Sequence, residues 1–278
     1  MSPHFAAYSF VDRITEFVPA RHARGTFAIP ATLAEFSSCL VAEAVGQLAA
    51  WVSMAHIDFR GRPVAALATE TRFHRDVEPG ETLRLQVDID HCDDDAVAYS
   101  GDASVDGARV IELVDCLGPM LPVADFDSPE ELRQRFDLLL GEGAQPGRFA
   151  GVTRPEITTT DRVEGKSLRA TLAVPLTAPF FGDHFPRRAV FPATLLLDSQ
   201  IRLATDLARE AMHTTPNPAR VTHVKMRSFI LPGQNVDISV DLAAVDDGLA
   251  KASLAARIDD KVVATARLEL TASCSSVA

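Results

Sequence analysis

Hydrophobic and polar residues alternate along segments in both halves of the chain. Residues 83–89 read Leu-Arg-Leu-Gln-Val-Asp-Ile, and residues 236–242 read Val-Asp-Ile-Ser-Val-Asp-Leu. A period of two puts successive side chains on opposite faces of a strand, so one face is buried and the other meets water. Pro-Gly and Asp-Gly pairs punctuate these segments. The pattern therefore predicts antiparallel strands joined by tight turns.

Two longer apolar stretches predict helices at residues 36–54 and 193–212. The first is apolar almost all round, which is typical of a helix buried on most sides. A short strand is expected before each helix, at residues 24–30 and 168–175. One helix wrapped by an antiparallel sheet, twice over, is an α+β arrangement.

The two halves are also similar in sequence. Residues 24–36 align with 169–181 at an offset of 145, and residues 77–89 align with 230–242 at an offset of 153. Matches in the same order at nearly constant offset indicate a duplication. The two offsets differ by eight residues. To explain this difference we place a gap of about ten residues between Phe36 and the helix that follows, offset by small changes later in the chain.

A connecting helix is predicted between the halves, over residues 127–140. Ser128 is its expected cap, Pro129 stands at the first helical position, and Glu131 completes a capping box. A glycine-rich stretch at 141–147 then ends it. We therefore expect an N-terminal domain at 1–125, a connecting helix and linker at 126–148, and a C-terminal domain at 149–278.

Composition narrows the class of protein. A net charge of −11 over 278 residues argues against a nucleic-acid partner, because phosphate binding needs a basic face. The four cysteines form no CxxC pair, which argues against a metal or redox motif and suits free thiols in a reducing compartment. We see no apolar run of membrane-spanning length and no signal peptide, so a cytoplasmic protein without a membrane partner is expected. The cysteines are Cys39, Cys92, Cys116 and Cys274.

The densest candidate chemistry lies at residues 180–200. His184 stands in a loop rich in Gly and Pro, a helix begins at Pro192, and Asp198 follows fourteen positions after the histidine. The first half has no such histidine loop. The Asp93-Asp94-Asp95 run, by contrast, is interpreted as a solvated turn and not as a metal site.

Residues 180–198 resemble the active-site signature of the β-hydroxyacyl-acyl-carrier-protein dehydratases, which have the hot-dog fold. The matching features are His-Phe-Pro, a proline eight residues after the histidine, and an acid on the following helix. Residues 10–17 resemble the family's N-terminal strand, and residues 39–47 resemble its helix. Together with the repeat, the resemblance implies a tandem double hot-dog. The chain departs from the pattern at four positions, namely Asp183, Ala189, Ala193 and Arg202.

The resemblance implies dehydration of a 3-hydroxyacyl thioester, in which a histidine and a carboxyl group share the acid–base work. In this family the histidine comes from one hot-dog and the acid from the other, which pairs His184 with Glu43. Asp198 would then belong to a vestigial second site, held by an ion pair with Arg202 one turn later. The competing assignment pairs His184 with Asp198.

Other residues are expected to bind the substrate. The backbone N–H of Ala193, at a helix N-terminus, is the candidate donor to the thioester oxyanion. Gly182 and Gln47 are further candidates for substrate binding, although Gln47 is better suited to an orienting or structural role than to a reacting one. Arg187 and Arg188 are candidate contacts for a carrier protein or a phosphopantetheine arm, or else belong to a solvated loop.

The expected partner is an acyl thioester on an acyl carrier protein or on CoA, in fatty-acid or polyketide-type biosynthesis. The resemblance implies no metal and no cofactor beyond the pantetheine arm of the substrate. The fused halves would act as a monomeric pseudo-dimer or as a homodimer. Two alternatives remain open, a non-catalytic acyl-binding or partner protein and a hot-dog thioesterase.

Overall fold

The computed structural model describes residues 4–246 and 248–272. Its helices are α1 (Ser38–His56), α2 (Pro129–Leu140) and α3 (Ala193–Met212), with short 3-10 turns η1 (Val123–Asp125) and η2 (Pro179–Gly182). Its strands are β1 (Arg13–Val18), β2 (His22–Ala28), β3 (Gly61–Pro63), β4 (Leu67–Phe73), β5 (Thr82–Cys92), β6 (Ala96–Val105), β7 (Ala108–Pro122), β8 (Glu156–Val163), β9 (Ser167–Ala173), β10 (Pro216–Met226), β11 (Asn235–Asp246), β12 (Leu249–Ile258) and β13 (Lys261–Ala272).

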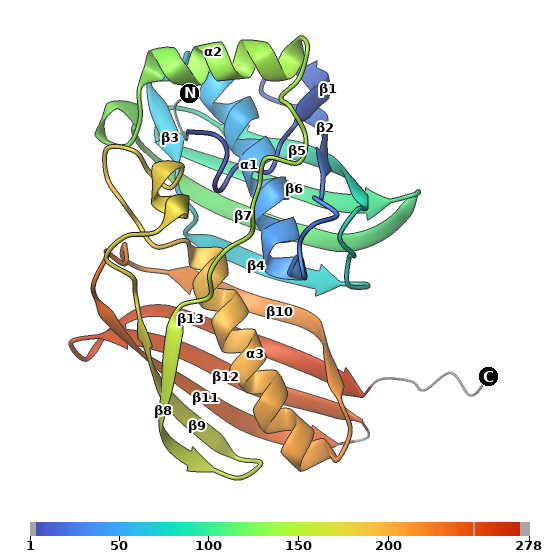
Figure 1. Ribbon diagram of the computed structural model, residues 1–278, viewed down its shortest axis with the longest axis vertical. Coiled ribbons are helices and arrows are strands. Elements are labelled where there is room, and N and C mark those ends of the chain that lie inside the picture. Colours follow the sequence, from blue (N-terminus) through green and yellow to red (C-terminus); the bar gives the residue numbers. More distant parts are fainter. Residues whose placement is uncertain (1–3, 247, 273–278) are drawn as a thin grey trace.

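One antiparallel sheet runs through both halves (Figure 1). Its strand order is β1-β2-β5-β6-β7-β4-β10-β13-β12-β11-β9-β8, with β3 paired to β7. The first six strands in this order belong to the first half of the chain. The last six are their counterparts in the second half, in the reverse order. The two halves meet where β4 pairs with β10, for example at Thr71 and Val221. This is the double hot-dog, α+β architecture that the sequence predicts.

The first residues of corresponding strands and helices in the two halves are separated by offsets close to those of the sequence repeat. Strand β9 begins 145 residues after β2, α3 begins 155 residues after α1, and β11 begins 153 residues after β5. The second copy therefore has ten more residues between strand and helix, as expected. Those residues form η2 and the histidine loop, whereas in the first copy the shorter segment 29–37 connects β2 to α1 without a helical turn.

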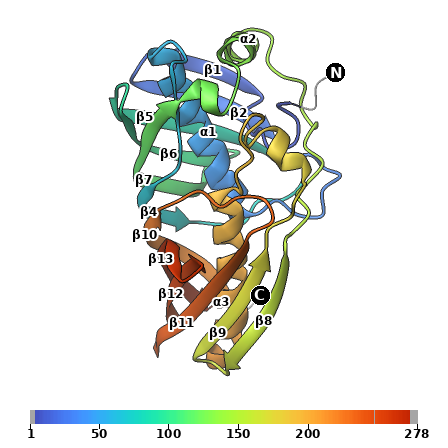
Figure 2. The ribbon, with the colours of Figure 1, turned by 90° about the vertical axis from the view of Figure 1, so that its left-hand side faces the viewer.

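Helix α1 lies within the curve of the first half-sheet, and α3 occupies the matching place in the second (Figures 1 and 2). Leu48 and Val52 of α1 have no exposed surface, and burial of such side chains contributes about 1.5–3 kcal/mol each. Contrary to expectation, α1 has the length and the mean hydropathy, 1.3, of a membrane span. Because 61% of that window is buried inside the fold, its apolar character belongs to a core helix.

The linker helix and the turns also follow their local sequence signals. Helix α2 begins at Pro129, and Ser128 Oγ accepts a hydrogen bond from the Glu131 N–H. Gly107, between β6 and β7, has a φ of +85°, which only glycine adopts without strain. Cys39, Cys92 and Cys116 are free thiols, while Cys274 lies outside the described residues.

Candidate active site

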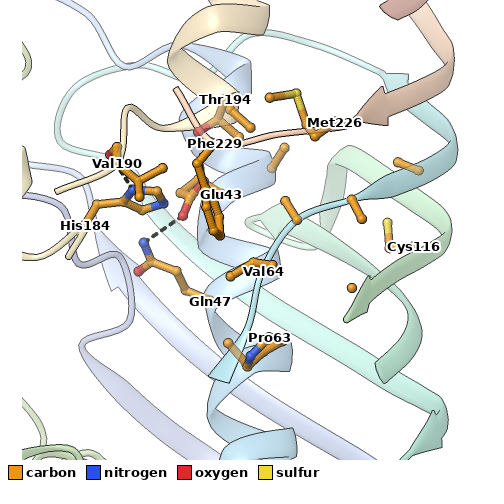
Figure 3. Close-up of a pocket in the computed structure, with 18 of the residues that line it drawn as sticks. Glu43, Gln47, Pro63, Val64, Cys116, His184, Val190, Thr194, Met226 and Phe229 are labelled. Atoms are coloured by element: carbon orange, nitrogen blue, oxygen red, sulfur yellow. Dashed lines mark hydrogen bonds between the residues drawn. The ribbon is translucent and has the colours of Figure 1, made fainter. Parts of the chain in front are cut away.

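A cavity of about 710 Å³ lies where the two halves meet. Its walls come from α1, α3, the histidine loop and the central strands β4, β7, β10 and β13. A volume of this size is typical of a site that encloses a small molecule. Figure 3 shows His184, Glu43 and Gln47 at one end of this cavity, with Val64 and Cys116 farther along it.

His184 is oriented by its own loop. Its Nδ1 donates a hydrogen bond to the carbonyl oxygen of Val190 at 2.8 Å. Because a carbonyl only accepts, Nδ1 carries the proton, and Nε2 of the neutral ring is left free to accept one. Burial lowers the pKa of His184, and the negative charge of nearby Glu43 opposes that shift. The side chain is therefore biased toward a neutral base, and Figure 3 shows it beside the Glu43 carboxyl.

Both carboxyl oxygens of Glu43 are held by hydrogen bonds. Thr194 Oγ1, at the start of α3, donates to Oε2 at 2.8 Å, and Gln47 Nε2 donates to Oε1 at 3.1 Å. The Glu43 carboxyl group thus stands on a helix of the first half and is fixed partly by a residue of the second. Tyr8 extends this chain, because its hydroxyl lies 2.8 Å from Thr194 Oγ1.

Gln47 acts as a clamp between α1 and the segment that precedes β1. Its Nε2 donates to the carbonyl oxygen of Tyr8 at 2.9 Å, and its Oε1 accepts from the N–H of Phe10 at 2.8 Å. Its amide is therefore engaged by the protein at both ends. This geometry fits an orienting residue better than a substrate ligand, although Gln47 does line the cavity.

Asp183 fixes the N-terminal segment, residues 4–9, beside the histidine loop. Its carboxylate accepts hydrogen bonds from the backbone N–H groups of Ala7 and Tyr8 at 2.9 and 2.7 Å, and from His4 Nδ1 at 3.2 Å. Burial would raise the pKa of Asp183, but these hydrogen bonds and the charge of His4 hold it below its usual value. The departure from the family pattern at Asp183 thus has a structural role.

A buried ion network continues behind this segment. His4 Nε2 lies 3.3 Å from Asp127, which also pairs with Arg62 at 3.2 Å. His4, Asp127 and Glu131 offer donor atoms within 4.8 Å of one another, as a metal site would. The Arg62 guanidinium already supplies positive charge to Asp127, so this cluster is explained as an ion-pair network.

The remaining predicted residues are divided between the cavity and the surface. Ala193 is the first residue of α3 and lines the cavity, as an oxyanion donor would. Gly182 ends η2, outside the cavity wall, and its carbonyl oxygen accepts from His4 at 3.1 Å. Arg188 lines the cavity, and its guanidinium lies 4.9 Å from the centre of the Phe229 ring. Arg187 is exposed and donates to the carbonyl oxygen of Ala124 at 3.0 Å.

Asp198 does not line the cavity, although it has the position on α3 that Glu43 has on α1. Arg202 Nε donates to its carboxylate at 2.7 Å, the ion pair expected from the sequence. Arg202 also donates to Glu35 at 2.8 Å, and Arg154 pairs with Glu35 as well. Charged side chains therefore fill the region where a second site would lie.

Sequence reasoning did not identify Thr194, Tyr8 or Arg62 as members of this site. Thr194 follows Ala193, a predicted site residue at the start of a helix, so its position could have assigned it to the site. Tyr8 and Arg62 offered none, because both reach the cavity only through contacts with residues far away in sequence.

Comparisons with known proteins agree with this arrangement. A family model for a FabA-like domain matches residues 36–114, and one for the ApeI dehydratase matches residues 160–267. The 3-hydroxyacyl-acyl-carrier-protein dehydratase FabZ of Albidiferax ferrireducens is 30% identical over 129 residues, which cover 44% of this chain and 85% of that protein. FabZ of Tolumonas auensis is 32% identical over 111 residues, covering 38% and 73%.

Solved structures match along almost the whole chain. The tesB protein of Mycobacterium avium subsp. paratuberculosis has a TM-score of 0.61 at 14% identity and covers 92% of this chain and 94% of its own. An acyl-ACP thioesterase from Bacteroides thetaiotaomicron has a TM-score of 0.55 at 10% identity, covering 90% and 97%. At such identities these likenesses establish the fold alone. The sequence relatives identify the family: the chain is a member of the FabZ-like hot-dog dehydratases, with two hot-dog domains in tandem.

Proposed function

We propose that the protein is a dehydratase that removes water from 3-hydroxyacyl thioesters held on an acyl carrier protein or on CoA. One observation carries the proposal: an imidazole whose Nδ1 donates to a backbone carbonyl lies beside a carboxyl from the other copy, in a largely apolar cavity. This pair supplies the base and the acid that elimination of water requires.

The proposed reaction uses each group once. His184 Nε2 removes the proton from C2 of the substrate, and the electron pair of that C–H bond forms the C2–C3 double bond. Glu43, in its protonated form, gives its proton to the departing 3-hydroxyl, which leaves as water. The Ala193 N–H, at the start of α3, stabilises negative charge that develops on the thioester oxygen. Transfer of the proton from His184 to Glu43 then restores the starting state.

Only one such centre per chain is proposed. The first copy contributes Glu43 and the second contributes His184, while Asp198 is engaged with Arg202 outside the cavity. We place the carrier or pantetheine arm near Arg188, because this cation lies in the cavity wall of an otherwise acidic protein.

The experiment is an assay of purified protein with 3-hydroxyacyl thioesters, in which the absorbance of the conjugated enoyl product is followed. We expect product from the native chain, and a rate lower by roughly 10²–10⁴-fold in His184→Gln and Glu43→Gln. His74→Gln, an exposed histidine, is the matched control. Release of free thiol without enoyl product would indicate a thioesterase. Substrate binding with neither reaction would indicate a non-catalytic acyl-binding protein.

A further inference from the structure

Gln200 is a buried polar residue of the cavity wall that the proposed reaction does not use. Its side chain belongs to α3, and the residue is 2% exposed. Its Nε2 has no hydrogen-bond partner among the described residues, although Gln200 lines the cavity. Leaving a buried N–H donor unpaired costs free energy, so an unpaired donor in a cavity wall points to a ligand that completes it.

The position of Gln200 relates it to the acyl chain and not to the reacting atoms. Residues Ala193, Thr194, Leu196, Leu197 and Gln200 line the cavity along one face of α3. Gln200 is seven residues beyond Ala193, which is about 10 Å along a helix axis. A thioester whose carbonyl lies at Ala193 would therefore extend its acyl chain past Leu197 toward Gln200.

Most of the facing wall is apolar. Val224 and Met226 of β10 and Ala264 and Ala266 of β13 line the same cavity, and the hydroxyl-bearing Thr265 lies between the two alanines. A plain alkyl chain entering this space would displace water and leave the Gln200 donor unsatisfied. An acyl chain with an oxygen at that depth would satisfy it.

We propose that the substrate's acyl chain carries a second oxygen, a keto or hydroxyl group well beyond C3, which accepts a hydrogen bond from Gln200 Nε2. Gln200 then selects oxygenated, polyketide-type 3-hydroxyacyl chains against plain alkyl chains of equal length. The inference rests on the proposed dehydratase function and specifies its substrate class. An enzyme discriminates in this way when only the correct substrate can form a hydrogen bond with a buried polar group of the site.

The test compares kcat/KM for two series of 3-hydroxyacyl thioesters, one with plain chains and one with a keto oxygen moved stepwise along chains of the same length. We expect the native enzyme to prefer one keto position by about tenfold or more over the plain chain. Gln200→Leu and Gln200→Met should lose that preference, so that the keto and plain chains of equal length react with similar kcat/KM. Gln134→Leu, which removes an exposed amide on α2, should keep it.

The proposal is overturned if the native enzyme shows no preference at any keto position, or if Gln200→Leu retains the preference. Thermal unfolding of the free protein gives an independent readout. An unpaired donor predicts that Gln200→Met melts no lower than the native chain, whereas a marked fall would assign Gln200 to a structural hydrogen bond and contradict the proposal.

Failure of the dehydratase function would be seen separately, as the absence of enoyl product from every substrate. In that case the equilibrium affinity of the His184→Gln variant for keto and plain acyl-pantetheine thioesters still tests Gln200. Equal affinities would reject the oxygen site, and a tenfold preference that disappears in the double variant with Gln200→Met would support it.

Discussion

Thr194 Oγ1 donates a hydrogen bond to Glu43 Oε2 over 2.8 Å, although the two residues are 151 positions apart in the chain. The bond links the first turn of α3 to the second turn of α1, so it joins the two copies at the site itself. Since Gln47 holds the other carboxyl oxygen, the Glu43 side chain has little freedom to turn away from His184.

Thr194→Val should therefore slow the reaction without weakening substrate binding much. Valine keeps the shape of threonine but removes the donor, and a buried oxygen left without its hydrogen-bond partner costs about 1–3 kcal/mol. We expect kcat to fall by about ten- to a hundredfold with KM nearly constant, measured by steady-state kinetics. Thr194→Ser keeps the hydroxyl and should recover most of the rate. A native kcat in Thr194→Val would show that Glu43 needs no such positioning.

Asp198→Asn should leave turnover unchanged. Its carboxylate is paired with Arg202 and is not part of the cavity wall, so asparagine at this position removes an ion pair and no group of the proposed reaction. The measurement is the dehydration rate beside that of Glu43→Gln, with Asp206→Asn as a control for loss of an acid on the same helix. Equal losses in Asp198→Asn and Glu43→Gln would reinstate Asp198 as the acid.

The pH profile of kcat/KM should report His184. The base must be neutral to accept a proton, so activity falls as pH drops through its pKa. Because burial lowers the pKa of His184 from 6.5, the acid limb should lie below pH 6.5. A fall of kcat/KM that begins above pH 6.5 would contradict this assignment. The residual activity of His184→Gln should not show this fall on the acid side.

Alkaline pH should weaken the attachment of the N-terminal segment. Burial alone would lower the pKa of His4, but hydrogen bonds to Asp127 and Asp183 and their charges raise it from 6.5 to about 9. The folded pKa exceeds the unfolded one, so this stabilisation is complete below pH 6.5 and is lost as pH rises through 9.

Urea unfolding midpoints across this range measure the effect. Between pH 6.5 and 9 the native chain should lose stability that the His4→Gln variant does not have. The difference between their unfolding midpoints should therefore shrink as pH rises. Parallel curves for the two proteins would show that His4 does not contribute through its charge.

Local patterns predicted most of the fold. The repeat indicated the two-copy sheet, Pro192 marked the start of α3, and the ten extra residues of the second copy were located before α3. The apolar run of α1 predicted a buried helix but did not distinguish it from a membrane span by composition, because that distinction depends on the sheet around it.

The candidate site was predictable only where a motif carried it. His184, Glu43 and Ala193 all line the cavity, whereas Gly182 does not and Arg187 lies at the surface. The attachments of Thr194 to Glu43 and of Asp183 to the N-terminal segment span more than 150 residues. No local spacing encodes such contacts, since they arise only when the two copies close around each other.

In a symmetric dimer of identical chains every substitution occurs twice, so both centres must tolerate it. Covalent fusion removes that restriction here. Glu43 and Gln47 keep the proposed acid and its hydrogen-bond partner on α1, while their counterparts Asp198 and Arg202 on α3 form an ion-pair network with Glu35. Each copy is free to specialise: in the proposed reaction the first supplies the acid, and the second supplies the base and the part of the cavity wall that contains Gln200.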